Sequence, residues 1–479
     1  MSIDHNLTAA IGASAEDRAG SYAVMHVLAA TVIVALFSYI FTQRRGRKKV
    51  SQKSQESCVH MPRTLLTSLV TPRQLETAIA EQHNCKPVIP FVPYKWPLAL
   101  DLLKRQYYIL FSDNTFERLT PFFDLAGTCR IHLFGNTGYF TTDPENIEAI
   151  LYTRFDDYGL GSRRLAFFSL LGEGIFGQDG PAWKRSRELI RHQFVRVQKQ
   201  IPEAFTPLVD ELVSGIAEAA VDEQVDLKPL MYQFTLATTT MLLFGEPHSS
   251  MAKEERDAVR DNFDYAAFGC GIRVRLADVA WLYNPAKYRN ACRANDFGEE
   301  AAAEKYAFII DFFHLVRNPV ILERLLEEIA SVPTGGDITR DQIQRLPFLR
   351  CWLNETLRLY PTLPLNLRSA NKPTVLPRGG GSDGRSPVLL PKGAGITHSV
   401  YHLHRLESIY GPDSRVYRPQ RWEDGELIRK ARLGAGYVDF NAGPRLCLGK
   451  DFALMEASYA IVRVLQAYPS IRLALGTPN

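Results

Sequence analysis

The sequence predicts a mainly α-helical protein with a small β part, folded as one large domain behind an N-terminal transmembrane helix. Long amphipathic patterns dominate from about residue 183 to residue 360. Short alternating stretches interrupted by Gly and Pro lie near residues 129–142 and 371–395. A chain of 479 residues, 46% of them hydrophobic, can bury the core of a single large domain.

The first expected element is the apolar run YAVMHVLAATVIVALFSYIF (22–41), which carries no Asp, Glu, Lys or Arg. Twenty helical residues span about 30 Å, the thickness of the hydrocarbon core of a bilayer. The basic stretch RRGRKK (44–49) follows at once, so the positive-inside rule places the remainder of the chain in the cytosol. A cleaved signal peptide is the alternative, but the start lacks a basic n-region and the apolar run is too long.

The anchor divides the chain into four parts. Residues 1–21 are expected to be lumenal, and Asn6 of the sequence NLT is a candidate glycosylation site there. Residues 22–41 form the anchor, and residues 42–97 form a basic, proline-rich linker that suits an exit from the membrane. Residues 98–479 form the globular domain.

Local signals predict the first elements of this domain. The stretch CRIHLFGNTGYFTT (129–142) alternates and breaks at Gly, which predicts a β-hairpin. Asp143 is a good N-cap and Pro144 a good first residue of the next helix. Asn318 and Pro319 give the same signal for the helix in NPVILERLLEEIASV. The apolar stripe of that helix comprises Ile321, Leu322, Leu325, Leu326 and Ile329.

Composition excludes several classes of function. The net charge is only +4, and no basic stripe with interleaved aromatic residues is present, so nucleic acid is not an expected partner. Seven scattered cysteines without a C-x-x-C pair suit a reducing compartment rather than a disulfide scaffold or a zinc module. The run GGGSDG (379–384) lacks the strand–loop–helix context of a phosphate loop and predicts a flexible turn.

The segment DFNAGPRLCLGK (439–450) places one thiol, Cys447, in a tight, basic, glycine-flanked loop before a helix-like run. A thiolate is a strong axial ligand, and the N–H groups of such a loop and the following helix N-terminus stabilise its charge. Gly443 and Gly449 let the backbone approach a flat cofactor, and Arg445 can reach an anionic group on it. A buried structural Cys in a turn is the alternative.

Every fixed position of the pattern F-x-x-G-x-R-x-C-x-G is present, and the loop resembles the haem-binding loop of the cytochrome P450 family. The resemblance covers roughly residues 86–470 and implies a P450-like haem domain over residues 98–479. It also implies haem b as the cofactor and Cys447 as the iron ligand, whose thiolate pushes electron density toward O–O cleavage. The loop residues that it assigns to cofactor binding are Phe440, Gly443, Arg445, Cys447 and Gly449.

A second family motif is ETLR, which supplies Glu355 and Arg358, and the later segment YRPQRW supplies Arg421. The resemblance implies that these three residues form a buried structural triad that locks the loop of Cys447. Gln420 stands where the family usually has an acid. The alternative for Glu355 and Arg358 is an ordinary exposed i,i+3 pair, worth about 0.2–0.5 kcal/mol.

A third motif, WKRSR, places Trp183 and Arg187 at i,i+4 on one helical face. The family uses this pair to hold a haem propionate, although an ordinary amphipathic helix often carries such a pair. The neighbouring segment LLGEGIFGQDGPAWKRSRELIRHQF, together with FTTDPENIEAIL and FDDYGLGSRR, looks like the microsomal alkane- and fatty-acid-hydroxylating P450s of yeasts and filamentous fungi.

That likeness implies an endoplasmic reticulum enzyme that takes electrons from NADPH–cytochrome P450 reductase. The implied substrates are O2 and a small apolar molecule: a fatty acid, an alkane or an alkyl-bearing fungal specialised metabolite. A basic surface would suit an acidic reductase, and a generic solvated surface is the alternative. The candidate basic residues are Lys184, Arg185, Arg191, Arg445 and Lys450.

The family's central helix, with its acid–Thr pair over the distal haem face, has no match here. The stretch EEAAAEKYAFIID (299–311) stands in its place, and residues 241–333 contain no Thr. The sequence therefore predicts an incomplete central helix and identifies no catalytic residue. The chain also ends after IRLALGTPN, where the family continues into a strand pair. A gene-model error, a decayed gene and a real variant are the three explanations.

Three hypotheses of function follow. The leading one is a membrane-anchored haem-thiolate monooxygenase that inserts one oxygen atom of O2 into a C–H bond. The second is a P450-like protein without monooxygenase activity, because the acid–Thr pair is absent. The third is a membrane-tethered adaptor with a structural Cys447, which would make all of the ordered motifs coincidences.

Overall fold

The computed structural model describes residues 72–110, 116–123, 126–133, 136–197, 201–221, 224–244, 253–294, 312, 314–433 and 435–472. The predicted anchor, Asn6 and the segment 299–311 all lie outside this part of the chain. None of the helices in the described ranges has both the length and the hydropathy of a membrane span.

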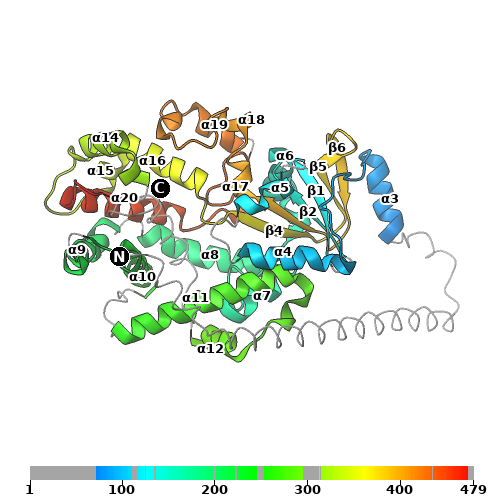
Figure 1. The fold of residues 1–479 in the computed structure, drawn as a ribbon, viewed down its shortest axis with the longest axis horizontal. Helices are drawn as coiled ribbons and strands as arrows, with labels where there is room; N and C mark the ends of the chain where they lie inside the picture. Colours follow the sequence, from blue (N-terminus) through cyan, green and yellow to red (C-terminus); the bar gives the residue numbers. More distant parts are fainter. Residues whose placement is uncertain are drawn as a thin grey trace. The chain divides into compact units, whose positions relative to one another are not determined.

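Helices make up most of the described structure, in agreement with the predicted fold class (Figure 1). They are α3 (Pro72–Gln82), α4 (Leu100–Leu110), α5 (Thr120–Phe123), α6 (Pro144–Glu148), α7 (Arg163–Leu171), α8 (Gly180–Val197), α9 (Ile201–Ala219), α10 (Leu227–Phe244), α11 (Lys253–Leu276), α12 (Ala286–Ala294), α14 (Pro319–Ile329), α15 (Arg340–Gln344), α16 (Pro347–Leu359), α17 (Val400–Leu403), α18 (Glu407–Tyr410), α19 (Glu426–Leu433) and α20 (Lys450–Ala467).

In the part of the chain that the structure describes, the strands form two sheets. The strands are β1 (Thr128–Leu133), β2 (Asn136–Thr141), β3 (Tyr158–Gly159), β4 (Leu365–Ala370), β5 (Thr374–Gly380), β6 (Ser386–Leu390) and β7 (Gly395–Ser399). One sheet has the order β1-β2-β7-β4-β3, in which only the β2–β7 pair is parallel, and β5 pairs with β6. The predicted hairpin is β1–β2, which is confirmed. The glycine-rich run 379–384 lies where β5 turns into β6, so the predicted turn is also present.

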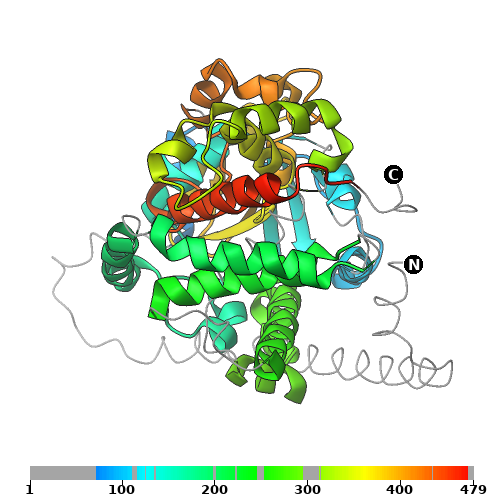
Figure 2. The same cartoon turned by 90° about the vertical axis from the view of Figure 1, so that its left-hand side faces the viewer.

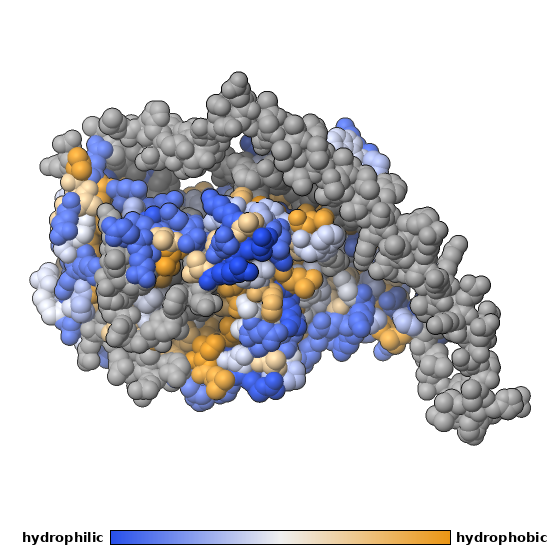
Figure 3. Space-filling model, turned by 90° about the horizontal axis from the view of Figure 1, so that it is seen from below, coloured by the Kyte–Doolittle hydropathy of each residue, from blue (hydrophilic) through white to orange (hydrophobic). Residues whose placement is uncertain are grey.

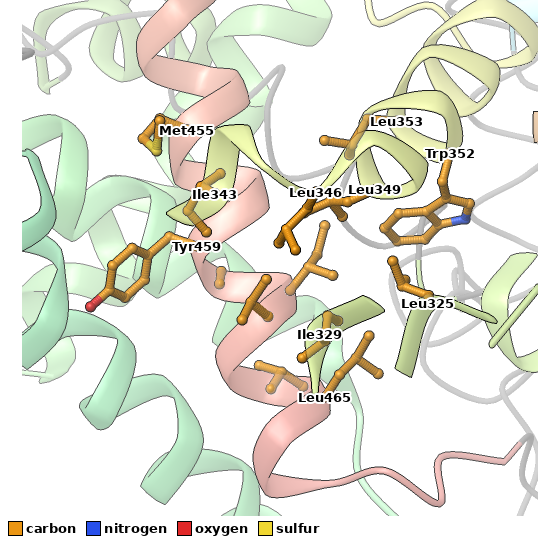
Figure 4. Packing of buried hydrophobic residues seen from close by; sticks show 14 of the residues in the cluster. Leu325, Ile329, Ile343, Leu346, Leu349, Trp352, Leu353, Met455, Tyr459 and Leu465 are labelled. Atoms are coloured by element: carbon orange, nitrogen blue, oxygen red, sulfur yellow. The ribbon is translucent and has the colours of Figure 1, made fainter. Parts of the chain in front are cut away.

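A large core joins the helices that are distant from the sheet. Helix α20, red in Figure 2, packs against α9, α14 and α15. Its Tyr459 and Leu465 meet Leu325, Leu349 and other residues of α14 to α16 in one hydrophobic cluster (Figure 4). A second cluster lies between the sheets and the segment that follows β2. The start of α20, where the loop of Cys447 ends, is therefore anchored in this core through Phe452 and Met455.

Helices α11 and α12 lie on the lower side of the view in Figure 1. Figure 3 shows this side, where hydrophobic residues form patches between hydrophilic ones. Where these two helices meet, the ring of Tyr288 in α12 is buried against Gly269 in α11. A Cβ atom added to Gly269 would lie 2.2 Å from that ring. Gly269 is thus needed for the close approach of the two helices.

The two predicted N-caps differ. Asp143 caps α6 as expected, because its Oδ1 accepts hydrogen bonds from the N–H groups of Glu145 and Asn146 at 2.9 and 3.3 Å. Asn318 precedes α14, but its side chain does not cap that helix and instead donates to the His314 carbonyl oxygen at 2.7 Å. The side chain of Asn318 therefore hydrogen-bonds to the preceding helical turn instead of capping α14.

The boundary of the compact unit differs from the predicted end of the linker. Residues 42–97 were expected to form a linker, whereas the compact unit runs from Pro72 to Leu473. Val88 and Val92 are buried, and the Val92 N–H donates to the Arg130 carbonyl oxygen at 2.8 Å. The hydrophobic effect of burying Val88 and Val92 stabilises the packing of residues 72–97 against the domain.

Candidate functional site

The loop of Cys447 closes on itself and is tied to the helix that follows. The Cys447 N–H donates to the Phe440 carbonyl oxygen at 3.0 Å, and α20 starts with a hydrogen bond from the Ala453 N–H to the Gly449 carbonyl oxygen at 2.8 Å. The Cys447 side chain is half-buried and is not part of a disulfide. The loop therefore holds a thiol at the start of a long helix, where the helix dipole favours negative charge.

Gly443 has a position that a larger residue could not occupy. Its φ is +62°, and a Cβ atom there would lie 1.9 Å from the carbonyl oxygen of Leu151. Leu151 belongs to a short π-helix, Ala149–Thr153, so the loop packs directly on that backbone. Gly449 differs, because a Cβ atom on it would meet the Phe194 ring at an ordinary 3.4 Å. Gly443 is thus the glycine on which the shape of the loop depends.

The predicted triad is present and buried. Arg358 donates to both carboxylate oxygens of Glu355, at 2.8 and 2.9 Å, and the Arg421 Nε donates to Glu355 Oε1 at 3.0 Å. The Trp422 indole and the Arg418 backbone N–H complete the shell around the carboxylate at 3.0 and 2.7 Å. Every charge in this group is partnered, as a buried ion network requires.

Two aromatic residues join the triad to the segment that leads into the thiol loop. Arg358 donates to the His404 carbonyl oxygen at 2.8 Å, and the His404 Nε2 accepts from the Val438 N–H at 3.0 Å. Tyr437 stacks on the His404 ring and donates to the Asn354 carbonyl oxygen at 3.1 Å. Burial lowers the pKa of His404 to about 3, which keeps the ring neutral and able to accept.

The predicted pair on α8 also contacts the loop. The Arg445 guanidinium lies 4.3 Å from the centre of the buried Trp183 ring, and that of Arg187 lies 5.6 Å from it. Arg187 also donates to the Leu446 carbonyl oxygen at 2.7 Å. The structure therefore brings Trp183 and Arg187 of α8 onto the loop that carries Arg445 and Cys447, more than 250 positions later in the sequence.

Several residues of this region were missed by sequence reasoning. Arg368 of β4 and His398 of β7 are both buried. Asn366 pairs with His398 across the two strands, and Arg368 lies two residues after Asn366, so all three side chains are on one face of the sheet. Arg163 of α7 donates to Asn366 at 2.7 Å. None of these residues belongs to the sequence motifs, because the register between two strands is what assembles them.

We call Arg163, Arg187, Arg368 and Arg445 the arginine cluster. Burial, followed by the charges of Arg163 and Arg445, lowers the pKa of Arg368 to about 9. Burial also lowers the pKa of Arg445 to about 10, against the opposing effect of Asp179, which accepts from Arg445 at 2.7 Å. Asp179 is the acid whose charge acts on both of these arginines.

The arginine cluster suits an anionic ligand. Within the described ranges, the Arg368 side chain forms no hydrogen bond. Neither ring nitrogen of the fully buried His398 has a partner, and a buried polar group without a partner costs about 1–3 kcal/mol. A haem brings two propionates and an iron that takes a thiolate, so the partnerless donors and Cys447 together fit this cofactor.

The five basic residues predicted to face a reductase separate into two groups. Lys184, Arg185 and Arg191 are exposed on α8. Lys450 instead pairs with the buried Asp439 at 3.2 Å, and Arg445 pairs with Asp179. Arg445 and Lys450 therefore make their contacts inside the protein, because each side chain lies beside an acid and an aromatic ring.

The chain matches the family model described as Cytochrome P450 in two segments, residues 90–306 and 307–471. It is 34% identical to Cytochrome P450 52A3-A of Candida maltosa over 428 residues, which cover 75% of this chain and 80% of that protein. It is also 34% identical to Cytochrome P450 monooxygenase g430 of a Fusarium species over 484 residues, covering 84% and 82%.

The alignments also show where the chain departs from its relatives. The Fusarium alignment runs over 484 positions but uses only 84% of this 479-residue chain, so the relative carries stretches that the chain lacks. The family match breaks between residues 306 and 307, inside the segment 299–311. On both sides of this break the match is maintained, and the chain belongs to the cytochrome P450 family.

Proposed function

We propose that this cytochrome P450 is a haem-thiolate monooxygenase that inserts one oxygen atom of O2 into a C–H bond of an apolar substrate. Electrons would come from NADPH through a cytochrome P450 reductase. The proposed substrate is a fatty acid, an alkane or a fungal specialised metabolite with an alkyl chain. The observation that carries the proposal is the closed Cys447 loop beside an arginine cluster whose members include a buried guanidinium without an acceptor among the described residues.

Each residue near the loop has a proposed role. Cys447 would supply the thiolate, and the N–H groups around it and the start of α20 would stabilise the charge on sulfur. Arg445, Arg187 and Arg368 would hold propionates as charge-assisted donors, with Trp183 covering the Arg445 guanidinium. Bound haem would supply the oxygen chemistry of the family. The triad of Glu355, Arg358 and Arg421 would act only by fixing the loop.

The location of the protein is part of the same proposal. Residues 22–41 would anchor it in the endoplasmic reticulum membrane, with residues 1–21 in the lumen and the haem domain in the cytosol. Asn6 would then be open to glycosylation. The exposed residues Lys184, Arg185 and Arg191 remain the proposed reductase contacts, since Arg445 and Lys450 are paired inside the protein.

The segment 299–311 makes product formation the decisive test. The acid–Thr pair that relays protons in the family is missing from the sequence there, and proton supply governs productive use of O2. The full chain, reconstituted with reductase in lipid, should consume NADPH in the presence of lauric acid or dodecane and yield a hydroxylated product. Haem-loaded protein that consumes NADPH without forming product from either class would contradict the proposal.

A further inference from the structure

Asp179 is a carboxylate that lies beside the guanidinium groups of the arginine cluster. Its Oδ1 accepts from Arg445 Nη2 at 2.7 Å, and its Oδ2 accepts from the Leu160 N–H at 2.9 Å. Leu160 follows strand β3, whereas Arg445 belongs to the loop of Cys447. The two oxygens therefore tie the loop to the edge of the sheet.

Two glycines lie beside this carboxylate, Gly180 next to it in the chain and Gly159 on the facing strand. Asp179 directly precedes α8, whose first residue, Gly180, has a φ of +60°. On the facing strand, a Cβ atom at Gly159 would lie 2.9 Å from Asp179 Oδ2. A side chain at position 159 would thus displace the carboxylate, and a glycine leaves room for it.

The Arg445 guanidinium is held in place around this contact. Its Nη2 also donates to the Gln178 carbonyl oxygen at 2.8 Å, and its guanidinium lies over the Trp183 ring. Three acceptors from one short segment, Ile175 to Asp179, therefore fix its direction. Removing the carboxylate would release the strongest of these contacts, because a bond between two charged groups exceeds one to a carbonyl.

We propose that Asp179 is a positioning residue for the haem: it orients Arg445 toward a propionate and adds a fixed negative charge beside the cofactor. The inference rests on the proposed haem site. Negative charge near the iron stabilises its oxidised, more positive state, so Asp179 lowers the reduction potential. Groups that orient the partners of a metal centre typically change metal affinity by about 10–100-fold, so Asp179 also slows haem loss.

An ordinary exposed ion pair is the competing role. The Asp179 side chain is 37% exposed, and exposed pairs are worth little to stability. A pair of that kind would leave the haem potential unchanged. The matched comparison is Glu173, an acid of the same loop region whose partner Arg164 is exposed and lies outside the arginine cluster.

The test uses the full chain with haem bound, as wild type, Asp179→Asn, Asp179→Glu and Glu173→Gln. Spectroelectrochemistry gives the reduction potential, and transfer of haem to apomyoglobin gives the rate of haem loss. Asp179→Asn should have a more positive potential and lose haem about tenfold faster. Asp179→Glu retains the charge and should restore the potential, and Glu173→Gln should match wild type in both measurements.

The outcomes separate this inference from the proposed function. Wild-type protein that takes up no haem would overturn the proposed function, and the role of Asp179 with it. If wild type retains haem while Asp179→Asn keeps the wild-type potential, the inference alone is wrong. A potential shifted equally by Asp179→Asn and Glu173→Gln would show a general charge effect and would also overturn it.

Discussion

Two groups of arginines are connected to the segment that carries Cys447, and they differ in how their charges are satisfied. Around Glu355, Arg358 and Arg421 find all of their acceptors in the protein. In the arginine cluster, Arg368 has no acceptor among the described residues, and Asp179 pairs with Arg445 while its charge also acts on Arg368. The first group is complete as a structural unit, whereas the second is complete only with an anionic ligand.

The sharpest test of this difference makes the same substitution in both groups. Arg358→Met leaves the Glu355 carboxylate buried without its main partner and should lower the free energy of unfolding by about 3–5 kcal/mol. Arg368→Met removes a buried charge that has no acceptor among the described residues of the ligand-free protein, so it should be neutral or stabilising there. Urea denaturation of the two haem-free variants measures both effects, and equal destabilisation would remove the distinction between the groups.

The next test targets the contact that shapes the loop between the two groups. Gly443→Ala introduces a side chain at positive φ against the Leu151 carbonyl oxygen and should cost about 2–4 kcal/mol. Gly449→Ala is the matched control, since its Cβ would make only ordinary contacts with Phe194. Denaturation of both variants compares them, and a similar loss in the control would contradict the role given to Gly443.

Acid should weaken the structural group through His404. Its folded pKa of about 3 lies below the ordinary 6.5, so the unfolded chain binds more protons between these values. Stability from this group is fully present above pH 6.5 and should fall by on the order of 1–2 kcal/mol by pH 5. His404→Gln should show a shallower decline between pH 7 and pH 5 in urea titrations, and an unchanged slope would count against this assignment.

The smallest effect is expected at the link from the structural group to the loop. Tyr437→Phe deletes the hydroxyl that donates to the Asn354 carbonyl oxygen but keeps the ring on His404. The loss should be about 1 kcal/mol, typical of one hydrogen bond. Chemical denaturation measures it. A loss of several kcal/mol would mean that the ring, rather than the hydroxyl, has moved.

Sequence reasoning identified the structural group more completely than the arginine cluster. Glu355 and Arg358 lie three positions apart on one helix, so local spacing places them on one face. The resemblance of compact motifs to the family added Arg421 and the role of Cys447. Arg368 and His398 meet only because β4 and β7 pair in one register, and Asp179 reaches Arg445 across 266 positions. A single sequence carries no direct signal for such distant pairings. The predicted cap at Asn318 failed for a different reason, because a nearby carbonyl competed for its side chain.

The most direct measurement is the reduced CO-difference spectrum of the full chain, with Cys447→Ala and Cys351→Ala measured beside it. Cys351 is a buried cysteine of the core, so its substitution controls for the loss of a thiol. Wild type and Cys351→Ala should show the band of a thiolate-ligated haem, and Cys447→Ala should not. A thiolate band that persists without Cys447, or wild-type protein that retains no haem, would contradict the account.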